Sequence, residues 1–368
     1  MKTSDFTFEL PENLVAQYPS SERGMDRLMV MNRKTGLFEH RMMNDLPSIL
    51  PKGTLMVFNN SRVRRARLIG VSEASGAEVE FLLTDRIPDG GGRDNDDAGR
   101  KSGQLWRAMV QRARRRRIGS RYLFPERGNS GGNVTGEIVA EDGEFRVLKF
   151  DRPVDDSWLD VNGHVPLPPY IRRQDTCDDG ERYQTVYACE HGSAAAPTAG
   201  LHFTNVLLKE IESAGIETAF ITLHVGLGTF LPVRTENIED HLMHEEVFSI
   251  NEETACKIEN ARAEGKMILA VGTTSARTLE SAWIDGPLIN GNVDSRIKRG
   301  EGRTSIFIYP GFVFKAVDAL FTNFHTPGST LLMLVSAFAG RDFILESYKE
   351  AIKEGYRFFS YGDACLII

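Results

Sequence analysis

At 368 residues the chain contains only four cysteines, and no two of them stand in a Cys-x-x-Cys pair. This spacing excludes a zinc ribbon and a dithiol redox motif of that form. Stable disulfides belong to oxidising compartments, so scattered cysteines are most simply interpreted as free thiols in a reducing cytoplasm. We therefore expect a cytoplasmic protein. The four residues are Cys177, Cys189, Cys256 and Cys365.

Long hydrophobic runs are also missing. No apolar stretch is long enough to span a bilayer, so we expect no membrane partner, and Met1-Lys-Thr-Ser-Asp5 lacks the charged-then-apolar layout of a signal peptide. Positive charge is in the minority, and the formal net charge of −7 argues against a generally basic nucleic-acid binder. What remains is a globular composition, 41% hydrophobic and 26% charged, in a chain with room for two domains.

Strand-like and helix-like segments alternate at both ends of the sequence. Thr54–Phe58 is strand-like, Met267–Val271 is typical of a buried strand, and the apolar residues of Ser305–Tyr309 predict a further strand. Asn251–Glu264 is typical of a helix, with acidic residues in its first turn and Gly265 at its end. This alternation indicates a layered α/β domain.

The pattern changes between about Val63 and Asp151, where short β-rich segments are separated by turns rich in Gly, Asp and Asn. Several short strands with regular turn signals are typical of a small barrel or sandwich. We therefore predict an α/β domain over residues 1–63 and 152–368, interrupted by an inserted β-barrel domain over residues 64–151. The expected strands are Ala66–Val71, Ala77–Thr84, Gln104–Val110, Arg121–Phe124, Val134–Ala140 and Glu144–Phe150.

Glycine-containing turns follow two of the expected α/β strands. The run Ala219–Val225 is followed by a Gly-Leu-Gly turn at 226–228. Met267–Val271 is followed by the hydroxyl-rich turn Gly272-Thr-Thr-Ser275, after which Ala276–Trp283 is expected to be a helix. α/β proteins bind small molecules at the carboxyl ends of strands, and the start of a helix can hold a carboxylate or a phosphate. Each motif alone is also typical of an ordinary turn.

Basic residues gather around the expected barrel in two groups. A solvated face is one interpretation of such groups. An arginine block on an acidic protein nevertheless favours an anionic partner, and RNA phosphate is the commonest one. The first group is Arg62, Arg64, Arg65 and Arg67, and the second is Arg112, Arg114, Arg115, Arg116, Arg117 and Arg121.

Further motifs run through most of the chain in a fixed order. They are Pro166–Ile171, Arg182–Ala188, Ala195–Thr204, Thr222–Phe230, His241-x-Met-His244 with Glu246, Val271–Thr274 with Arg277 and Glu280, Thr322–His325, Ser329–Gly340 and Tyr356–Asp363. Through these blocks the chain resembles the S-adenosylmethionine:tRNA ribosyltransferase-isomerase family, bacterial-type enzymes of queuosine biosynthesis. The sequence departs from the usual family pattern at Asn60, at Arg64-Arg65 and at Gly328.

The resemblance implies an α/β domain interrupted by a β-barrel, and it implies a transferase. Such an enzyme transfers and isomerises the ribose of S-adenosylmethionine onto 7-aminomethyl-7-deazaguanine at the wobble position of a tRNA. Epoxyqueuosine-tRNA forms, and adenine and methionine leave. S-adenosylmethionine is then a consumed cosubstrate, tRNA is the macromolecular partner, and no bound cofactor is expected. We also expect a monomer.

The resemblance and the chemistry together suggest the catalytic residues. The sulfonium makes the C5′ protons of the cosubstrate acidic, and adenine must leave with a proton, so a base and an acid are needed. Histidine titrates in the useful range, and four histidines lie in the matching blocks. We expect two of these four to move protons and Glu246 to orient one or to act as a base; each histidine could instead fix a turn. The histidines are His202, His224, His244 and His325.

Binding residues are expected in the same blocks. Arg277 could hold the methionine carboxylate or pair with Glu280. His241 and His244 have the spacing of metal ligands on a helix, but no third ligand is evident and we expect no metal. The expected substrate-binding residues are Gly200, Gly226, Gly228, Thr229, Thr273, Thr274, Arg277, Tyr361 and Asp363, and the expected tRNA-binding residues are Arg62, Arg64, Arg114, Arg115, Arg116 and Arg117.

Two other functions are compatible with parts of the sequence. A methyltransferase would use the same cosubstrate but release S-adenosylhomocysteine. A non-catalytic RNA-binding module would use the arginines, bind tRNA without turnover, and leave the glycine turns and histidines unexplained. Product analysis therefore separates these alternatives from the ribosyl transfer.

Overall fold

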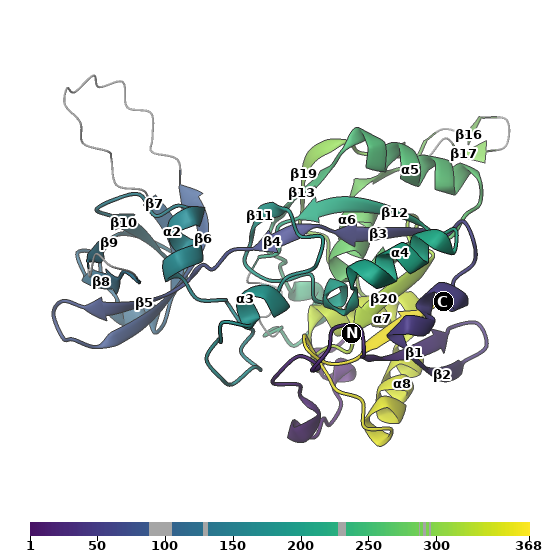
Figure 1. Cartoon of the computed structure of the whole chain (residues 1–368), viewed down its shortest axis with the longest axis horizontal. Helices are drawn as coiled ribbons and strands as arrows, with labels where there is room; N and C mark the ends of the chain where they lie inside the picture. The colour runs from purple at the N-terminus through teal and green to yellow at the C-terminus, as the bar shows by residue number, and fades with distance from the viewer. Residues whose placement is uncertain (88–104, 128–131, 227–232, 287, 290–291, 294–295) are drawn as a thin grey trace. The chain divides into compact units, whose positions relative to one another are not determined.

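The computed structural model describes residues 1–87, 105–127, 132–226, 233–286, 288–289, 292–293 and 296–368 (Figure 1). Its chain forms two compact units. The first comprises Met1–Arg62, Pro168–Gln174 and Glu181–Ile368, and the second comprises Val63–Leu167 and Asp175–Gly180. The fold class predicted from the sequence, a layered α/β domain with an inserted β-barrel, is confirmed.

A nine-stranded sheet forms the centre of the first unit. Four of its strands are mutually parallel, in the order β12, β3, β14 and β20, and β21 runs antiparallel to β20. The sheet order is β19 (Gly300–Thr304), β13 (Glu246–Ile250), β12 (Glu217–Leu223), β3 (Leu55–Asn59), β14 (Ile268–Val271), β20 (Ala319–Asn323), β21 (Ala364–Ile367), β1 (Arg27–Asn32) and β2 (Leu37–Met42).

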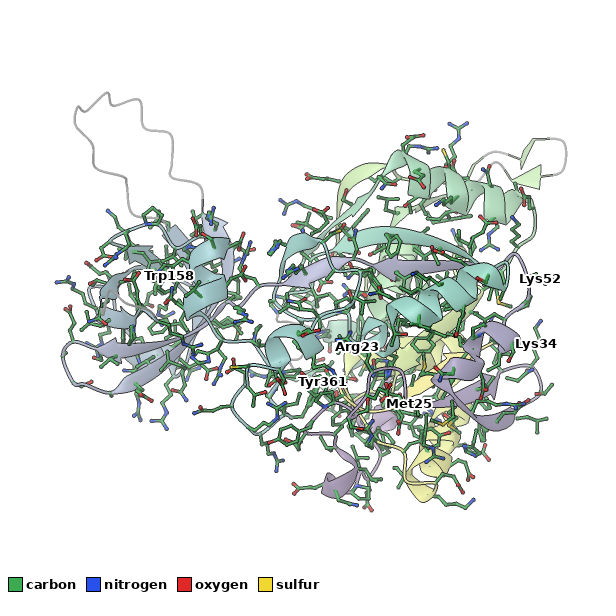
Figure 2. The ribbon with its side chains drawn as sticks, in the orientation of Figure 1. Arg23, Met25, Lys34, Lys52, Trp158 and Tyr361 are labelled. Atoms are coloured by element: carbon green, nitrogen blue, oxygen red, sulfur yellow. The ribbon has the colours of Figure 1, made fainter. Side chains whose placement is uncertain are left out.

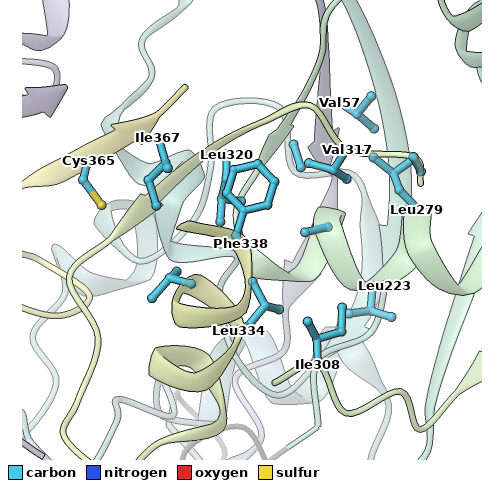
Figure 3. Close-up of a cluster of buried hydrophobic side chains, with 14 of the residues drawn as sticks. Val57, Leu223, Leu279, Ile308, Val317, Leu320, Leu334, Phe338, Cys365 and Ile367 are labelled. Atoms are coloured by element: carbon cyan, nitrogen blue, oxygen red, sulfur yellow. The ribbon is translucent and has the colours of Figure 1, made fainter. Parts of the chain in front are cut away.

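Helices cover both faces of this sheet, which is why its central strands are apolar on both sides. In β3, Leu55 and Val57 belong to one buried cluster, whereas Met56 and Phe58 belong to the other. We call the cluster with Leu55 and Val57 the first cluster and the other the second cluster. Figure 3 shows part of the first cluster, with Val57 of β3 and Leu334 among its labelled residues. Helices α5 (Glu252–Ala263), α6 (Thr273–Ala282), α7 (Thr330–Ala339) and α8 (Arg341–Lys353) contribute to the first cluster, and α1 (Leu46–Ile49) and α4 (Asn205–Ser213) contribute to the second.

Local capping explains where several of these helices begin. The side chains of Thr204, Asn251 and Ser329 accept hydrogen bonds from backbone N–H groups in the first turns of α4, α5 and α7. Such caps satisfy N–H groups that have no partner within the helix. Helix α6 differs, because Gly272 precedes it with a φ of 90° and supplies no side-chain cap.

The structure corrects three details of the predicted elements. Helix α6 already begins at Thr273 rather than at Ala276, since the left-handed Gly272 turns the chain from β14 directly into the helix. Ser305–Tyr309 is not a strand; its apolar residues pack against the first cluster instead. The segment from His241 to His244 is not helical, because the short 3-10 helix η7 (Ile238–Asp240) ends before it.

The second unit contains a closed six-stranded barrel, as the sequence predicted. Its centre is a cluster of aromatic rings around Phe124, and Gly70 and Gly136 lie so close to that ring that an added Cβ would be 2.8 Å from it. The strands, in barrel order, are β10 (Phe145–Phe150), β7 (Leu105–Val110), β6 (Glu78–Ile87), β5 (Arg67–Ser72), β8 (Arg121–Pro125) and β9 (Asn133–Asp142).

Helix α2 (Asp156–Asn162) belongs to the second unit and packs on the barrel through Trp158 and Leu159 (Figure 2). Its N-cap Asp155 accepts a hydrogen bond from the Trp158 N–H. The expected domain boundary at residue 151 therefore lies before this helix, whereas the compact unit continues to Leu167. Further short elements of the chain are η1 (Thr3–Phe6), η2 (Glu12–Leu14), η3 (Met43–Asp45), β4 (Ser61–Val63), η4 (Ala113–Arg115), α3 (Asp179–Arg182), β11 (Glu190–Ser193), η5 (Thr198–His202), β15 (Trp283–Ile284), β16 (Leu288–Ile289), β17 (Asn292–Val293) and β18 (Arg296–Ile297).

Candidate active site

A pocket lies at the carboxyl edge of the parallel strands in the first unit. It encloses about 700 Å³ of empty space, part of it open to solvent, and its wall comes from the segments that follow β12, β14 and β20. This is the edge at which open α/β sheets bind their ligands. The lining residues used below are Tyr170, Val225, Thr273, Thr274, Asn323, His325, Phe359 and Ser360.

The amino end of α6 forms one side of the pocket. Thr273 and Thr274 both line it, and the Thr274 hydroxyl is buried without a hydrogen-bond partner among the described residues. The first N–H groups of a helix have no intrahelical acceptor, and the helix dipole favours a negative charge there. The arrangement can therefore hold a carboxylate, with Thr274 as an additional donor.

A buried ion pair stands one helical turn further along α6. Arg277 Nη1 lies 2.5 Å from Glu246 Oε2, and both side chains are 4% exposed. Glu246 Oε1 accepts a hydrogen bond from the Gly226 N–H at 3.0 Å. Arg277 Nε and Nη2 are buried and have no hydrogen-bond acceptor among the described residues. Three of the expected site residues, Gly226, Glu246 and Arg277, are thus brought together.

The alternative pairing of Arg277 with Glu280 is wrong. The Glu280 carboxylate accepts hydrogen bonds from the backbone N–H groups of Lys315, Ala316 and Val317 instead. Burial raises the pKa of Glu280, although these N–H groups oppose the shift. Glu280 therefore holds the chain before β20, and Arg277 is left for Glu246 and for any ligand.

A second buried network surrounds His202. Its Nδ1 lies 2.8 Å from Asp26 Oδ2, and the other oxygen of Asp26 accepts from Arg357 Nη2 at 3.0 Å. Burial alone would raise the pKa of Asp26, but His202 and Arg357 hold it below its usual value. On the far side, His202 Nε2 lies 3.0 Å from Asn323 Nδ2. Asp363, an expected substrate-binding residue, accepts from the backbone N–H of Arg357 at 2.7 Å.

His325 lies in the wall of the main pocket. Its Nε2 is 2.9 Å from the Thr322 hydroxyl, and its backbone N–H donates to the Tyr348 hydroxyl oxygen at 3.0 Å. Burial lowers the pKa of His325 to about 3. The imidazole is therefore neutral at pH 7, and the sequence-based expectation that it titrates in the useful range does not hold for this residue.

The other predicted residues are more scattered. His224 is half-buried, with Gly192 packed so closely on its ring that an added Cβ would be 2.9 Å away. His244 is exposed and does not line the pocket. The Cβ position of Gly200 is blocked by the Tyr187 hydroxyl, so this glycine permits a packing contact. The catalytic or binding roles of these residues stay predictions.

Tyr361 and Arg23, both labelled in Figure 2, line a smaller cavity. Asp26 and His202 line the same cavity. The predicted residues Gly228 and Thr229 lie outside the described part of the chain. Sequence reasoning missed Asp26, Asn323 and Arg357. Asn323 and Arg357 carried a signal, since both fall in matching blocks, whereas Asp26 falls in none.

The arginines divide into two kinds. Arg64 is held in an ion pair with Asp156 at 2.5 Å, with its side chain 16% exposed, and Arg62 is half-buried. In the turn between β7 and β8, residues 112, 114, 115 and 117 are exposed and residue 116 is half-buried. We name residues 112–117 the arginine loop. Its four exposed arginines can meet an anion without first breaking a buried contact.

Fold and pocket define a class, an α/β protein with an inserted barrel and a pocket at the carboxyl edge of its sheet. A family described as queuosine biosynthesis protein matches residues 3–367 of the chain. The chain belongs to this family, and it is a transferase. This confirms the resemblance seen in the sequence. In the part of the chain that the structure describes, no helix is both long and apolar enough to cross a membrane.

Similar proteins support this assignment. A protein from Treponema denticola is 52% identical over 368 residues, and one from Clostridioides difficile is 46% identical over 369 residues; the matches cover 100% of this chain and of each relative. Both are named S-adenosylmethionine:tRNA ribosyltransferase-isomerase. The crystal structure of S-adenosylmethionine tRNA ribosyltransferase from Thermotoga maritima is 34% identical, covers 99% of this chain and 100% of its own, and has a TM-score of 0.52.

Proposed function

We propose that the chain transfers and isomerises the ribosyl group of S-adenosylmethionine onto 7-aminomethyl-7-deazaguanine at the wobble position of tRNA. Epoxyqueuosine-tRNA is the product, and adenine and methionine are released. The observation that carries the proposal is the family match over residues 3–367. The pocket at the sheet edge supports it, because it offers the cosubstrate both a polar helix start and an apolar wall.

The two ends of S-adenosylmethionine need different surroundings, and the pocket supplies them. We place the methionine carboxylate at the first turn of α6, where Thr274 adds a hydroxyl, with Arg277 one helical turn further along. The adenine ring fits beside Tyr170 and Phe359, whose ring centroids are 4.7 Å apart. Placing both ends fixes the sugar between them, so that the bonds to adenine and to sulfur can break in a defined geometry.

The contacts of Glu246 and the burial of His325 limit the proton transfers that each can perform. Glu246 is engaged by Arg277 and by the Gly226 N–H, so it acts as a base only if one of these contacts opens. A neutral His325 can accept a proton or hydrogen-bond to the substrate, but it cannot serve as an imidazolium donor at pH 7. Proton transfer by His202, His224 and His244 belongs to the same proposal.

Product analysis tests the reaction. Incubation with S-adenosylmethionine labelled in the ribose should move the label into tRNA and release adenine and methionine in equal amounts. A tRNA with guanine at the wobble position is the control and should take up no label. Release of S-adenosylhomocysteine would instead show a methyltransferase. Binding of tRNA without any turnover would leave only an RNA-binding module.

The tRNA surface is proposed to include the arginine loop. Arg112 adopts a left-handed φ of 54° there, and the buried Arg146 of β10 donates hydrogen bonds to the carbonyls of Ala113 and Arg116 at 2.9 and 3.0 Å. A buried guanidinium thus fixes the backbone of a turn that already carries several positive charges. An anion outside the barrel relieves this repulsion, as a phosphate backbone would. Arg62 and Arg64 remain further candidates for binding tRNA.

Neutralising three exposed arginines should weaken tRNA binding. We expect Arg114→Gln, Arg115→Gln and Arg117→Gln together to lower affinity at least tenfold, and to reduce the slope of log K against log salt by about 0.7–0.9 for each phosphate that the protein no longer neutralises. The measurement is tRNA binding at several salt concentrations. Arg41→Gln is the control, since Arg41 is an exposed arginine of β2 paired with Glu39. An unchanged salt slope would make the arginine loop a solvated face.

A further inference from the structure

Asn323 is the last residue of β20, and only one of the two polar atoms of its side chain has a hydrogen-bond partner among the described residues. Its Nδ2 donates to the carbonyl oxygen of Phe359 at 3.1 Å and approaches His202 Nε2 at 3.0 Å. Its Oδ1 is buried and has no hydrogen-bond partner among the described residues. The residue is 2% exposed. A buried carbonyl without a donor is unfavourable in the ligand-free protein, so a donor from elsewhere is expected to meet it.

The orientation of this amide follows from the chemistry of its neighbours. A peptide carbonyl can only accept hydrogen bonds, so Asn323 must turn its NH2 group toward Phe359. The reverse orientation would place two carbonyl oxygens against each other. Oδ1 is therefore the atom that is left over.

The same orientation fixes the tautomer of His202. Because the Asn323 NH2 group donates to Nε2, that nitrogen carries no proton, and the single ring proton lies on Nδ1 and is donated to Asp26. Asp26 is held in turn by Arg357 at 3.0 Å. Both nitrogens of His202 are thus occupied by protein groups. His202 therefore acts as a positioning residue for Asn323.

The pocket that Asn323 lines has the character of a base-binding site. Its described wall combines the rings of Tyr170 and Phe359 with alanine, proline and leucine side chains, and no aspartate or glutamate contributes to that wall. An ammonium group favours a carboxylate, whereas the amine of a purine is neutral and suits an amide oxygen. A neutral acceptor beside aromatic rings is the recurrent arrangement for a nucleobase.

The geometry points to Asn323 Oδ1 as the acceptor for the exocyclic amine of the adenine in S-adenosylmethionine, with His202 and the Phe359 carbonyl holding the amide in place. This inference rests on the proposed function, since it takes the adenosyl cosubstrate as the ligand of the pocket. It adds a residue that selects the base. Adenine is thereby held while its glycosidic bond breaks.

The test compares two cosubstrates in two proteins. The first is S-adenosylmethionine, and the second is its analogue with hydrogen in place of the 6-amino group. Wild-type protein should bind the analogue about tenfold more weakly, the loss that follows when one hydrogen bond to a buried acceptor is removed. Asn323→Ala should lose a similar factor with S-adenosylmethionine and should no longer distinguish the two cosubstrates.

Full discrimination by Asn323→Ala would overturn the inference and leave the proposed function intact. Wild-type protein that moves no ribose label to tRNA would instead overturn the proposed function. Thr326→Ala is the matched control, because this residue lines the same pocket and should keep wild-type discrimination. A further measurement uses only the wild-type protein, so its result does not depend on whether a variant folds. Nitrogen-15 spectra of His202 in the wild type should show the proton on Nδ1, and a proton on Nε2 would also overturn the inference.

Discussion

Replacing Glu246 with alanine is expected to lower the free energy of unfolding by about 3–5 kcal/mol, because it leaves Arg277 as an uncompensated buried charge. The two side chains are each 4% exposed, and their nearest atoms are 2.5 Å apart. The substitution also removes the acceptor of the Gly226 N–H. Urea denaturation of the purified protein measures this loss. Glu217→Ala, which breaks the exposed pair with Lys266, should change the free energy of unfolding little.

A double substitution separates a structural role of the pair from a functional one. Glu246→Leu with Arg277→Met should recover most of the lost stability, because apolar side chains of similar volume often replace a buried ion pair at no net cost. In the proposed function Arg277 holds the methionine carboxylate, so binding of S-adenosylmethionine should nevertheless stay weak. A double variant that binds and turns over the cosubstrate normally would show that the pair only supports the fold. A stable Glu246→Ala would show that Arg277 finds other compensation.

The choice of partner for Arg277 shows where sequence reasoning reached its limit. Glu280 is three residues away on the same helix, a spacing at which side chains are neighbours, so a pair within the helix was a reasonable expectation. The structure pairs Arg277 with Glu246, 31 residues earlier, because Glu280 is drawn to the backbone N–H groups before β20. Such choices depend on how a helix is rotated against the sheet. The spacing of residues along the helix sequence does not reveal that rotation.

Features that have a local sequence pattern could be predicted. The apolar run Thr54–Phe58 predicted a strand, which the structure shows as β3, and Asn251–Glu264 predicted the helix that the structure shows as α5. The pocket edge also followed from the turns after β12 and β14. Asp26 could not be found in this way, since it is 176 residues from His202 and lies in no motif. Ser305–Tyr309 carried a strand-like pattern only because its side chains pack in the core.

The pH dependence of stability should show the burial of His325. Its pKa is about 3 in the folded protein against a usual value of 6.5. Between these values the unfolded chain binds one proton more than the folded protein, so the free energy of unfolding rises with pH and falls on acidification. From pH 7.5 to pH 5.0 the contribution of this residue amounts to about 2 kcal/mol. Buried His325 is therefore expected to make the protein markedly acid-sensitive.

His325→Gln provides the measurement, because its amide can reach the Thr322 hydroxyl but does not titrate. Urea denaturation at pH 7.5 and pH 5.0 should show a drop about 2 kcal/mol smaller for this variant than for the wild type. Asp26 and Glu280 titrate in both proteins, so their contributions cancel in the difference. Thr322→Val should keep the wild-type drop, since it removes the hydrogen bond and leaves the imidazole.

Equal drops in wild type and His325→Gln would contradict the burial argument and would restore His325 as a candidate proton donor. A smaller drop in the free energy of unfolding for His325→Gln than for the wild type would instead argue against His325 as a proton donor. In the proposed reaction, a histidine that stays neutral down to pH 5 is a hydrogen-bonding wall of the pocket, which Asn323 also lines. The proposed reaction then takes the proton that leaves with adenine from another group or from solvent.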